Sequence, residues 1–503
     1  MHALTNLGDL FDRNKPDKPA IIDLSGDAPR TYSYQELDAM AKGVARSLVA
    51  KGYRRGDRIA ILSANNAEYV AVLYGTMRAG LIPVPVNFKF PRALIHYVIE
   101  DSGARMIFHD EARRDDCPSG MPAVAFGTTG EQGFDAFLDP GPFDAIVPQQ
   151  GETAVFLYTS GSTGKPKGVM LSHQSHLWVV ASRLAGQELE RHRYLIAAPL
   201  YHMNALALTQ LSSAAHATVV LLSQFTTGSY ADAIGQYQCT WLTAVPPMIA
   251  MMLRDTEAVA RADLSSVEFL RMGSAPVSPS LIAGIHAAMP NAKISNAYGT
   301  TEGGPLVFGP HPAGIPQPTL SVGYKHPLVD LRLVDGDNQD ADRGLLEMRC
   351  PSLMTGYHNR PDLKPPFTED GFYKTGDVFT RDENGFHYFV GRVDDMFVCG
   401  GENIYPSDVE KMLERHPDVA QACVVPIDDE IKGQKPVAFI VPREGATLTE
   451  EAVKTFALAN AAAYQHPRFV WFLPRLPLAT TNKIDRNALI EIAKTRAGAA
   501  LAG

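Results

Sequence analysis

The sequence has few cysteines, no long apolar run and no excess of positive charge. Its five cysteines are scattered and never form a C-x-x-C pair, so neither a disulfide framework nor a zinc site is expected. The longest apolar stretch, residues 195–222, is interrupted by proline, histidine, asparagine and glutamine, which argues against a membrane-spanning helix. These absences predict a protein of a reducing compartment, the cytoplasm, with no membrane span.

The formal net charge of −9 argues against nucleic acid or an anionic membrane as the partner, because both require a basic surface. Asp9 and Asp12 lie where a secretory signal would need its apolar core, so no such signal is expected. The chain of 503 residues is too long for one hydrophobic core, and its length predicts two to four domains.

Helical and strand patterns alternate over the first 300 residues. Ser33 and Glu36 form a capping-box pattern, apolar residues then recur at helical spacing, and Arg58–Leu62 reads as a strand. Such alternation predicts parallel sheets with helices on their faces. After residue 318, short alternating runs separated by turn residues predict a small antiparallel sheet or barrel. A compact α+β pattern begins near residue 392.

The stretch YTSGSTGKPKGVMLSH, residues 158–173, combines glycines, small hydroxyl residues and lysines. It is not a Walker A loop, because Gly161 and Gly164 are only two residues apart and Pro166 follows Lys165. Glycines nevertheless allow backbone N–H groups to point at an anion. The stretch therefore favours phosphate binding over a flexible surface hairpin. The candidate contacts are Thr159, Ser160, Gly161, Ser162, Thr163, Gly164, Lys165 and Lys167.

Four further motifs follow in order. They are NAYGTTE (296–302), YKTGD (373–377), GRVDDMFVCGGENIYPSDVE (391–410) and LPLATTNKIDR (476–486). Together with the loop at 158–173, they resemble the adenylate-forming enzymes, which comprise acyl-CoA synthetases, luciferases and peptide-synthetase adenylation domains. The resemblance extends from about residue 30 to residue 490, and aryl- and fatty-acyl-CoA ligases are most similar.

The resemblance implies an α/β fold with two domains. The large N-terminal domain, residues 1–392, would hold two doubly wound α/β subdomains and a small β-barrel, and it would bind ATP and the acid. The small α+β domain, residues 393–503, would be mobile about a hinge near Asp394. It would carry the catalytic lysine and the face that meets coenzyme A.

The resemblance also assigns nucleotide contacts. Glu302 would bind magnesium, since a hard cation prefers carboxylate oxygen, and Thr301 would contact the α-phosphate. Asp377 offers two oxygens to two ribose hydroxyls, with Arg392 nearby. Tyr298 would stack on adenine. The remaining predicted nucleotide contacts are Gly273, Ser274, Ala275, Asn296, Ala297, Gly299 and Thr300.

Lys483 is the predicted catalytic cation. Adenylation joins a carboxylate to the α-phosphorus of ATP, so two anions must meet, and a preorganised ammonium lowers that barrier. Many relatives have glycine before this lysine, whereas this sequence has Asn482. Gly400 and Gly401 lack side chains, which would let the pantetheine arm of coenzyme A lie against the backbone.

The acid would lie beside His202, the candidate gate of the acyl tunnel, although a core histidine is an equal alternative. The other predicted lining residues are Met203, Ala205, Met272, Ala297, Gly303, Gly304, Pro305 and Leu306. None is charged, and a second carboxylate would be buried without a partner. This argument favours a monocarboxylic acid with an aromatic, phenylpropenoid or fatty body.

Coenzyme A is the favoured acyl acceptor. Positions 202–208 and 242–250 contain no aspartate for an amino group, and no carrier domain is appended. A stand-alone enzyme that loads a carrier protein, a luciferase-type oxygenase and a non-enzymatic nucleotide sensor remain alternatives. The sensor would not need Lys483. A homodimer is an open alternative to a monomer.

Overall fold

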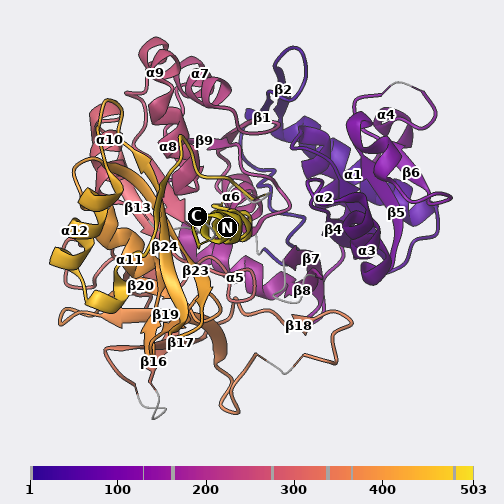
Figure 1. Cartoon of the computed structure of the whole chain (residues 1–503). Helices are drawn as coiled ribbons and strands as arrows, with labels where there is room; N and C mark the ends of the chain where they lie inside the picture. Colours follow the sequence, from indigo (N-terminus) through magenta and orange to yellow (C-terminus); the bar gives the residue numbers. More distant parts are fainter. Residues whose placement is uncertain are drawn as a thin grey trace.

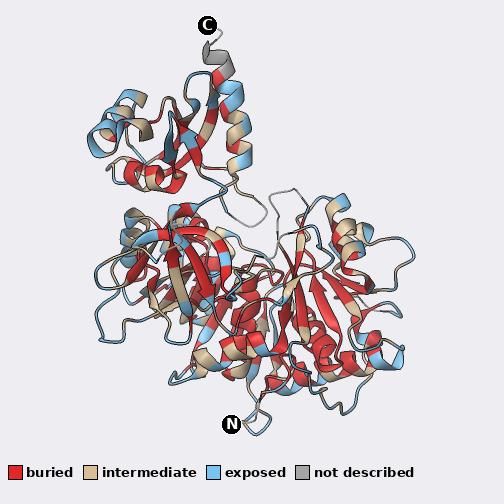
Figure 2. Cartoon of the chain, turned by 90° about the horizontal axis from the view of Figure 1, so that it is seen from below, coloured by how far each residue is buried: buried red, intermediate tan, exposed pale blue. Residues whose placement is uncertain are grey.

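The computed structural model describes residues 4–128, 130–159, 165–273, 277–335, 340–363, 366–479 and 483–501, with side chains up to residue 497. Helices and parallel strands fill the first 300 residues, an antiparallel sheet follows, and the last hundred residues form a separate α+β body (Figure 1). Seen from below, this C-terminal body stands apart on top of the rest (Figure 2). Within the described residues, no helix has the length and apolarity needed to cross a bilayer.

The largest sheet has seven strands in the order β13-β12-β11-β9-β10-β1-β2, and only β1 and β2 pair in antiparallel fashion. Helices cover both faces of this sheet. Alternate residues of its strands therefore point into two different hydrophobic cores. Its strands are β1 Pro19–Asp23, β2 Arg30–Ser33, β9 Arg193–Ile196, β10 Thr218–Leu221, β11 Trp241–Ala244, β12 Phe269–Gly273 and β13 Lys293–Ala297. The helices of this part are α5 His173–Leu184, α6 Met203–Ala214, α7 Thr227–Tyr237, α8 Pro246–Arg254, α9 Thr256–Arg261 and α10 Pro279–Ala288.

A second, four-stranded parallel sheet has the order β4-β3-β5-β6. Its strands are β3 Arg58–Leu62, β4 Ile82–Pro85, β5 Ala104–His109 and β6 Ala123–Ala125. Its helices are α1 Tyr34–Ala50, α2 Ala67–Arg78, α3 Arg92–Ser102, the 3₁₀ helix Glu111–Asp116 and α4 Phe134–Phe137. A three-stranded sheet, β18-β8-β7, lies next to it and comprises β7 Thr153–Thr159, β8 Lys167–Ser172 and β18 Gly356–Tyr357.

The predicted small barrel is a six-stranded antiparallel sheet whose edge strands are β14 and β16. Its strands are β14 Phe308–Gly309, β15 Gly323–Lys325, β16 Asp330–Val334, β17 Arg343–Arg349, β19 Tyr373–Arg381 and β20 Phe386–Arg392. The C-terminal body has a five-stranded sheet of β21 Phe397–Cys399, β22 Glu402–Ile404, β23 Val419–Asp429, β24 Gly433–Pro442 and β25 Val470–Phe472. Around it lie α11 Pro406–Leu413, α12 Glu450–Asn460, the 3₁₀ helix Ala463–Gln465 and α13 Arg486–Leu501.

The C-terminal body has apolar cores of its own and contacts the larger part through polar groups. Residues of β21–β25 and α11–α13 form two cores that include no residue before Phe397. Helix α11 binds β20, because the Ser407 hydroxyl and the Lys411 ammonium donate to the carbonyl oxygens of Val390 and Phe389. The mainly polar contact is consistent with two bodies that fold around separate cores.

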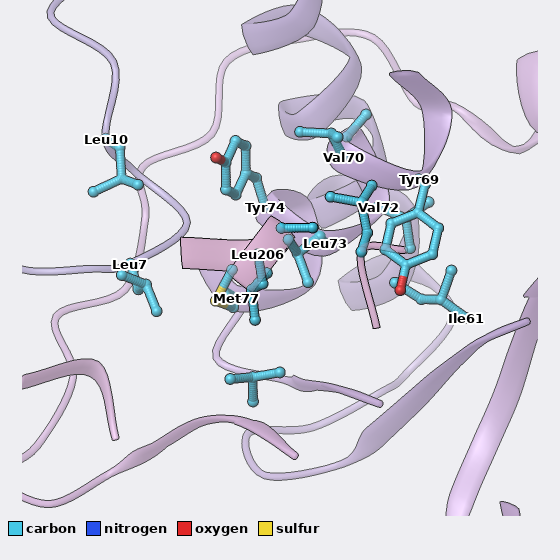
Figure 3. Packing of buried hydrophobic residues seen from close by; sticks show 14 of the residues in the cluster. Leu7, Leu10, Ile61, Tyr69, Val70, Val72, Leu73, Tyr74, Met77 and Leu206 are labelled. Carbon is cyan, nitrogen blue, oxygen red and sulfur yellow. The ribbon is translucent and has the colours of Figure 1, made fainter. Parts of the chain in front are cut away.

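The N-terminal core depends on a close crossing of α1 and α2. The predicted capping box is present, because the Ser33 hydroxyl and the Glu36 carboxylate each accept a backbone N–H from the other residue. Almost every side chain of α2 is buried, and large apolar residues from it fill the centre of the core (Figure 3). Gly75 is the point of contact with α1, where a Cβ atom would lie 2.5 Å from the Ala41 carbonyl oxygen.

We expect Gly75→Ala to lower the free energy of unfolding by about 1–3 kcal/mol, because the added methyl group must push two packed helices apart. The measurement is urea or thermal unfolding. Gly26→Ala is the matched control, since the nearest atom to its Cβ would be 3.7 Å away. Equal stability of the two variants would contradict the proposed close crossing.

Candidate functional site

One tyrosine, Tyr357, links the described end of the glycine-rich loop to the Gly-Thr-Thr-Glu turn. The Lys167 ammonium lies 4.6 Å from the centre of the Tyr357 ring, a cation–π contact. The Tyr357 hydroxyl donates to Glu302 Oε1 at 3.0 Å. Strand β18, which carries Tyr357, pairs with β8, which carries Lys167. Fold geometry thus joins two motifs that are more than 130 residues apart in sequence. Tyr357 was not predicted, because it lies outside all the motifs.

The turn that presents Glu302 is fixed by its own backbone. The Thr300 hydroxyl accepts from the Gly303 N–H at 2.8 Å, and the Thr300 carbonyl accepts from the Gly304 N–H at 2.9 Å. Gly304 has φ +84°, where a side chain would be strained. The Glu302 carbonyl accepts from the Met354 N–H at 2.8 Å. Glu302 therefore projects its carboxylate from a rigid turn.

Tyr298 and Asp377 lie in direct contact. The Tyr298 hydroxyl donates to Asp377 Oδ2, and its ring packs edge-on against Phe379 at 4.9 Å. Asp377 is 4 % exposed, and burial raises the pKa of its carboxyl, against the hydrogen bond from Tyr298 and the charge of Arg392. Arg392 Nε lies 3.7 Å from Asp377 Oδ1. The predicted adenine and ribose residues therefore form one cluster.

Lys483 reaches this cluster from the C-terminal body. Lys483 is an exposed residue, but desolvation by the protein atoms around its ammonium group, followed by the charge of Arg392, lowers the pKa of that group. Asp377 and Asp395 oppose that shift. Lys483 is held by its backbone, because its carbonyl accepts from the Ala479 N–H at 2.7 Å. The catalytic candidate and the ribose candidate are thus brought together.

His202 lies at the start of α6 and is affected by the charge of Lys483. Burial, and then the charges of Lys483 and Lys89, lower the pKa of its imidazole to about 3, so the ring is neutral at ordinary pH. Its Nε2 atom is buried and has no hydrogen-bond partner among the described residues. The hydroxyl of Thr159, at the end of β7, is also buried without a described partner. A bound ligand could supply the missing partner, although buried polar atoms outside the predicted site, such as the hydroxyls of Tyr69 and Thr76, also have no described partner.

The predicted acyl-pocket residues fall on both faces of the large sheet. Met203 and Ala205 join the core beneath α5 and α6, whereas Met272 packs into the core beneath α7, α8 and α10. The neighbour of Met272, Arg271, points to the opposite face and donates to the Pro305 carbonyl oxygen at 3.0 Å. Arg183 donates to the same oxygen, also at 3.0 Å. Neither arginine was among the predicted lining residues, which are all uncharged.

Some of the other predicted contacts lie at the β12–β13 edge of the large sheet. The rest lie outside the described residues. Gly273 lies so close to Ala297 that a Cβ atom would be 2.8 Å from its carbonyl oxygen, and the Asn296 amide donates to the Leu320 carbonyl at 3.0 Å. Thr301 and Leu306 are half-buried, and Gly299 packs against Pro305. The predicted contacts that lie outside the described residues are Ser160, Gly161, Ser162, Thr163, Gly164, Ser274 and Ala275. Asn482 also lies outside the described residues.

The predicted hinge and thiol-binding residues are exposed. The Asp394 side chain is 68 % exposed and lies 3.7 Å from Arg392 Nη2. Gly400 and Gly401 have φ values of +61° and +90°, which favour glycine, and a Cβ atom at Gly401 would meet no atom within 4 Å. Their backbone is open to an approaching ligand. The hinge and the thiol-binding face stay predictions.

The site suits magnesium only together with phosphate groups. Across the described ranges, no group of three or more His, Cys, Asp or Glu side chains could hold a metal ion. Glu302 supplies one carboxylate, and its Oε1 already accepts a hydrogen bond. Magnesium commonly binds through one or two carboxylates, substrate phosphates and water, so the residues present fit that mode.

Comparison with known proteins gives a consistent family. The AMP-binding enzyme family matches residues 10–358, and the AMP-binding enzyme C-terminal domain matches residues 408–483. A feruloyl-CoA synthase from Amycolatopsis sp. is 32% identical over 90% of this chain and 92% of its own length. A sulfoacetate–CoA ligase from Cupriavidus necator is 30% identical over 94% and 95%. The crystal structure of ATP-bound MatB from Rhodopseudomonas palustris has a TM-score of 0.86 at 27% identity, covering 97% of this chain and 99% of that one.

We expect Tyr357→Phe to raise the half-saturating ATP concentration several-fold, because Glu302 loses the hydrogen bond that orients its carboxylate. The ring beneath Lys167 remains. The measurement is initial rate against ATP concentration at saturating magnesium. Tyr388→Phe is the matched control, since it removes a similar 3.0 Å bond to Asp382 on a different hairpin. An unchanged ATP dependence in Tyr357→Phe would show that this bond does not serve the site.

Proposed function

Because the chain belongs to the AMP-binding enzyme family, we propose that it works as an AMP-forming acid–thiol ligase, an acyl-CoA synthetase. It joins a carboxylic acid to ATP to give an acyl-adenylate and pyrophosphate. It then transfers the acyl group to coenzyme A and releases AMP. The family match, together with the contact of Tyr298 and Arg392 with Asp377, carries this proposal, and the charge of Lys483 acts on both Asp377 and His202.

The first half-reaction needs a positive charge between two anions. The carboxylate oxygen attacks the α-phosphorus, negative charge gathers on the phosphate oxygens, and pyrophosphate leaves. Lys483 would lie between the two groups and stabilise that charge. A lysine held there before the chemical step would need little reorganisation during the reaction.

The remaining residues hold the nucleotide. Asp377 would accept hydrogen bonds from the ribose hydroxyls, in exchange for the one it now receives from Tyr298. Arg392 would contact ribose and phosphate, and Thr301 would donate to the α-phosphate. Magnesium, bound by Glu302 and the phosphates, would neutralise part of the triphosphate charge.

The acid would lie between α6 and the large sheet, with its carboxylate near His202. The neutral imidazole has an unpartnered Nε2 atom, which can hydrogen-bond to the acid without adding charge. Relatives named for feruloyl and sulfoacetate substrates show how widely the family's acids vary. For this chain we propose an acid with an aromatic, phenylpropenoid or fatty body, in a pocket that includes Gly303, Gly304 and Leu306.

Thioester formation would use a second pose of residues 393–503 relative to residues 1–392. A turn about Asp394 would withdraw Lys483 and bring the Gly400–Gly401 backbone to the acyl-adenylate. The exposed Asp394 side chain and the separate cores of the C-terminal body support such a motion.

A cytoplasmic location and a homodimer are further proposals. Free cysteines at all five positions support a reducing compartment. The homodimer remains a prediction from the sequence.

We expect Lys483→Ala to slow adenylation by about 10²–10³-fold, because the charge that stabilises the transition state is removed. Thioester formation from pre-made acyl-adenylate and coenzyme A should keep most of its rate. Pyrophosphate release measures the first half-reaction, and thioester absorbance measures the second.

Lys494→Ala is the control for this experiment, since it removes an exposed lysine of α13 that pairs only with Glu491. If Lys483→Ala and the control retain equal adenylation rates, the assignment of the catalytic lysine is wrong. If AMP forms without thioester in the unaltered enzyme, coenzyme A is not the acceptor, and the result favours a carrier-protein acceptor or a luciferase-type oxygenase.

The pH dependence of adenylation should report the lowered pKa of Lys483. The protonated form is active, so kcat/KM is full below the pKa in the folded enzyme and falls as pH rises through it. Because desolvation and the charge of Arg392 lower this pKa below the ordinary value of 10.5, the alkaline loss begins at lower pH than for a lysine with the ordinary pKa. Lys483→Arg should shift the loss to higher pH, since guanidinium keeps its proton. An alkaline limb that is unmoved in Lys483→Arg would assign the loss to another group.

A further inference from the structure

Two arginine side chains converge on one backbone oxygen beside the Gly-Gly-Pro-Leu segment. Arg183, in the last turn of α5, and Arg271, in the middle of β12, each donate through Nη2 to the Pro305 carbonyl at 3.0 Å. Both side chains are half-buried. Their guanidinium groups therefore lie side by side, although they are 88 positions apart in sequence.

Neither guanidinium has an anionic partner. Across the described ranges, no carboxylate forms an ion pair with Arg183 or Arg271, whereas other buried or half-buried arginines, Arg78, Arg113 and Arg332, are paired with carboxylates. Glu302, three residues before Pro305, is engaged by Tyr357 instead. Burial lowers the pKa of Arg183 to about 10, and burial together with the charge of Arg183 lowers that of Arg271. Two adjacent half-buried cations that share one neutral acceptor leave several N–H donors available.

The position of the pair places it along the predicted acyl pocket. Strand alternation turns Arg271 away from the buried Leu270 and Met272 and onto the face that α5 and α6 cover. Arg271 is in register with Thr243, which donates to Asn204 of α6 at 2.9 Å. Asn204 is two residues beyond His202. The arginines thus lie on the same face as the His202 end of α6.

Aromatic rings extend the same face toward the amino ends of the strands. Trp241 stacks on Phe269 at 4.6 Å, and Tyr194 packs against Trp241 at 5.4 Å. Along this face, His202 and Lys483 lie at the carboxyl ends of the strands. The two arginines come next, and the aromatic rings lie toward the amino ends. An acid whose carboxylate lies near His202 would direct its far end toward the arginines.

We propose that Arg183 and Arg271 form a subsite for a second anionic group on the acid, a carboxylate or a sulfonate remote from the carboxylate that is activated. This inference rests on the proposed acyl-CoA ligase function. An oxyanion group matches the fork of N–H donors that paired guanidinium groups present. The preference for a monocarboxylic acid was drawn from uncharged lining residues alone, and the arginines remove that premise.

The test compares acids that differ only at the far end. Pairs such as terephthalate with 4-methylbenzoate, glutarate with valerate, and 4-sulfobutyrate with valerate are each assayed for AMP release with the full chain. We expect kcat/KM to favour the anionic member of at least one pair by tenfold or more. Arg183→Met and Arg271→Met should each reduce that preference by about tenfold or more, while changing the rate with the neutral member much less.

Arg193→Met is the matched control, because Arg193 makes a similar guanidinium–carbonyl bond, to Tyr237 at 2.8 Å, on the exposed start of β9. The control should keep the wild-type preference. If the unaltered enzyme prefers the neutral member of every pair, the subsite is refuted without any variant. Equal losses on both members in Arg183→Met and Arg271→Met would show that the arginines only position Pro305.

The outcomes also separate this inference from the function on which it rests. AMP release with neutral acids alone would overturn the anionic subsite and leave the ligase function intact. No AMP release with any acid in the panel would overturn the ligase function itself. A variant that fails to fold is replaced by the other arginine variant, and the wild-type preference decides in either case.

Discussion

A carboxylate and a phosphate repel each other, and an enzyme that joins them must surround their meeting point with positive charge. The proposed site lies at the carboxyl ends of the large parallel sheet, the usual position for ligands in open α/β sheets. Strands β12 and β13 lead to the nucleotide residues, and β19 and β20 bring Asp377 and Arg392 from the antiparallel sheet. The last cation, Lys483, comes from the C-terminal body. No single segment of the chain holds the complete site.

The pKa values of the ionisable residues in the proposed site are shifted in directions that bound anions would partly reverse. Burial lowers the pKa of Lys483, His202, Arg183 and Arg271 and raises that of Asp377. All five shifts disfavour the charged form of the group. A bound triphosphate and a bound acid would raise the lowered pKa values of the lysine, histidine and arginines, because their negative charges stabilise the cations. Substrate binding and the protonation of these residues are therefore coupled.

Much of the fold could be predicted from the sequence, because local signals agree with the tertiary structure. The capping box at Ser33, the strand at 58–62 and the change of pattern after residue 318 all correspond to observed elements. Two residues from separate motifs, Tyr298 and Asp377, lie in contact, and their roles and that of Lys483 stay predictions. Arg183, Arg271 and Tyr357 could not be found in this way. Each is ordinary in its local sequence, and its role arises from a contact with a residue 34 to 122 positions away. The packing of Met272 against α8 rather than the α6 face likewise depends on which strand face turns toward which helix.

The attachment of α11 to β20 has a consequence for sequence variation. Ser407 and Lys411 bind carbonyl oxygens of the strand backbone, at Val390 and Phe389, rather than side chains. Every amino acid offers the same carbonyl group. The two bodies can therefore keep this mode of attachment while residues 389 and 390 change, provided that the strand persists, and substitutions can accumulate there without matching changes in the helix.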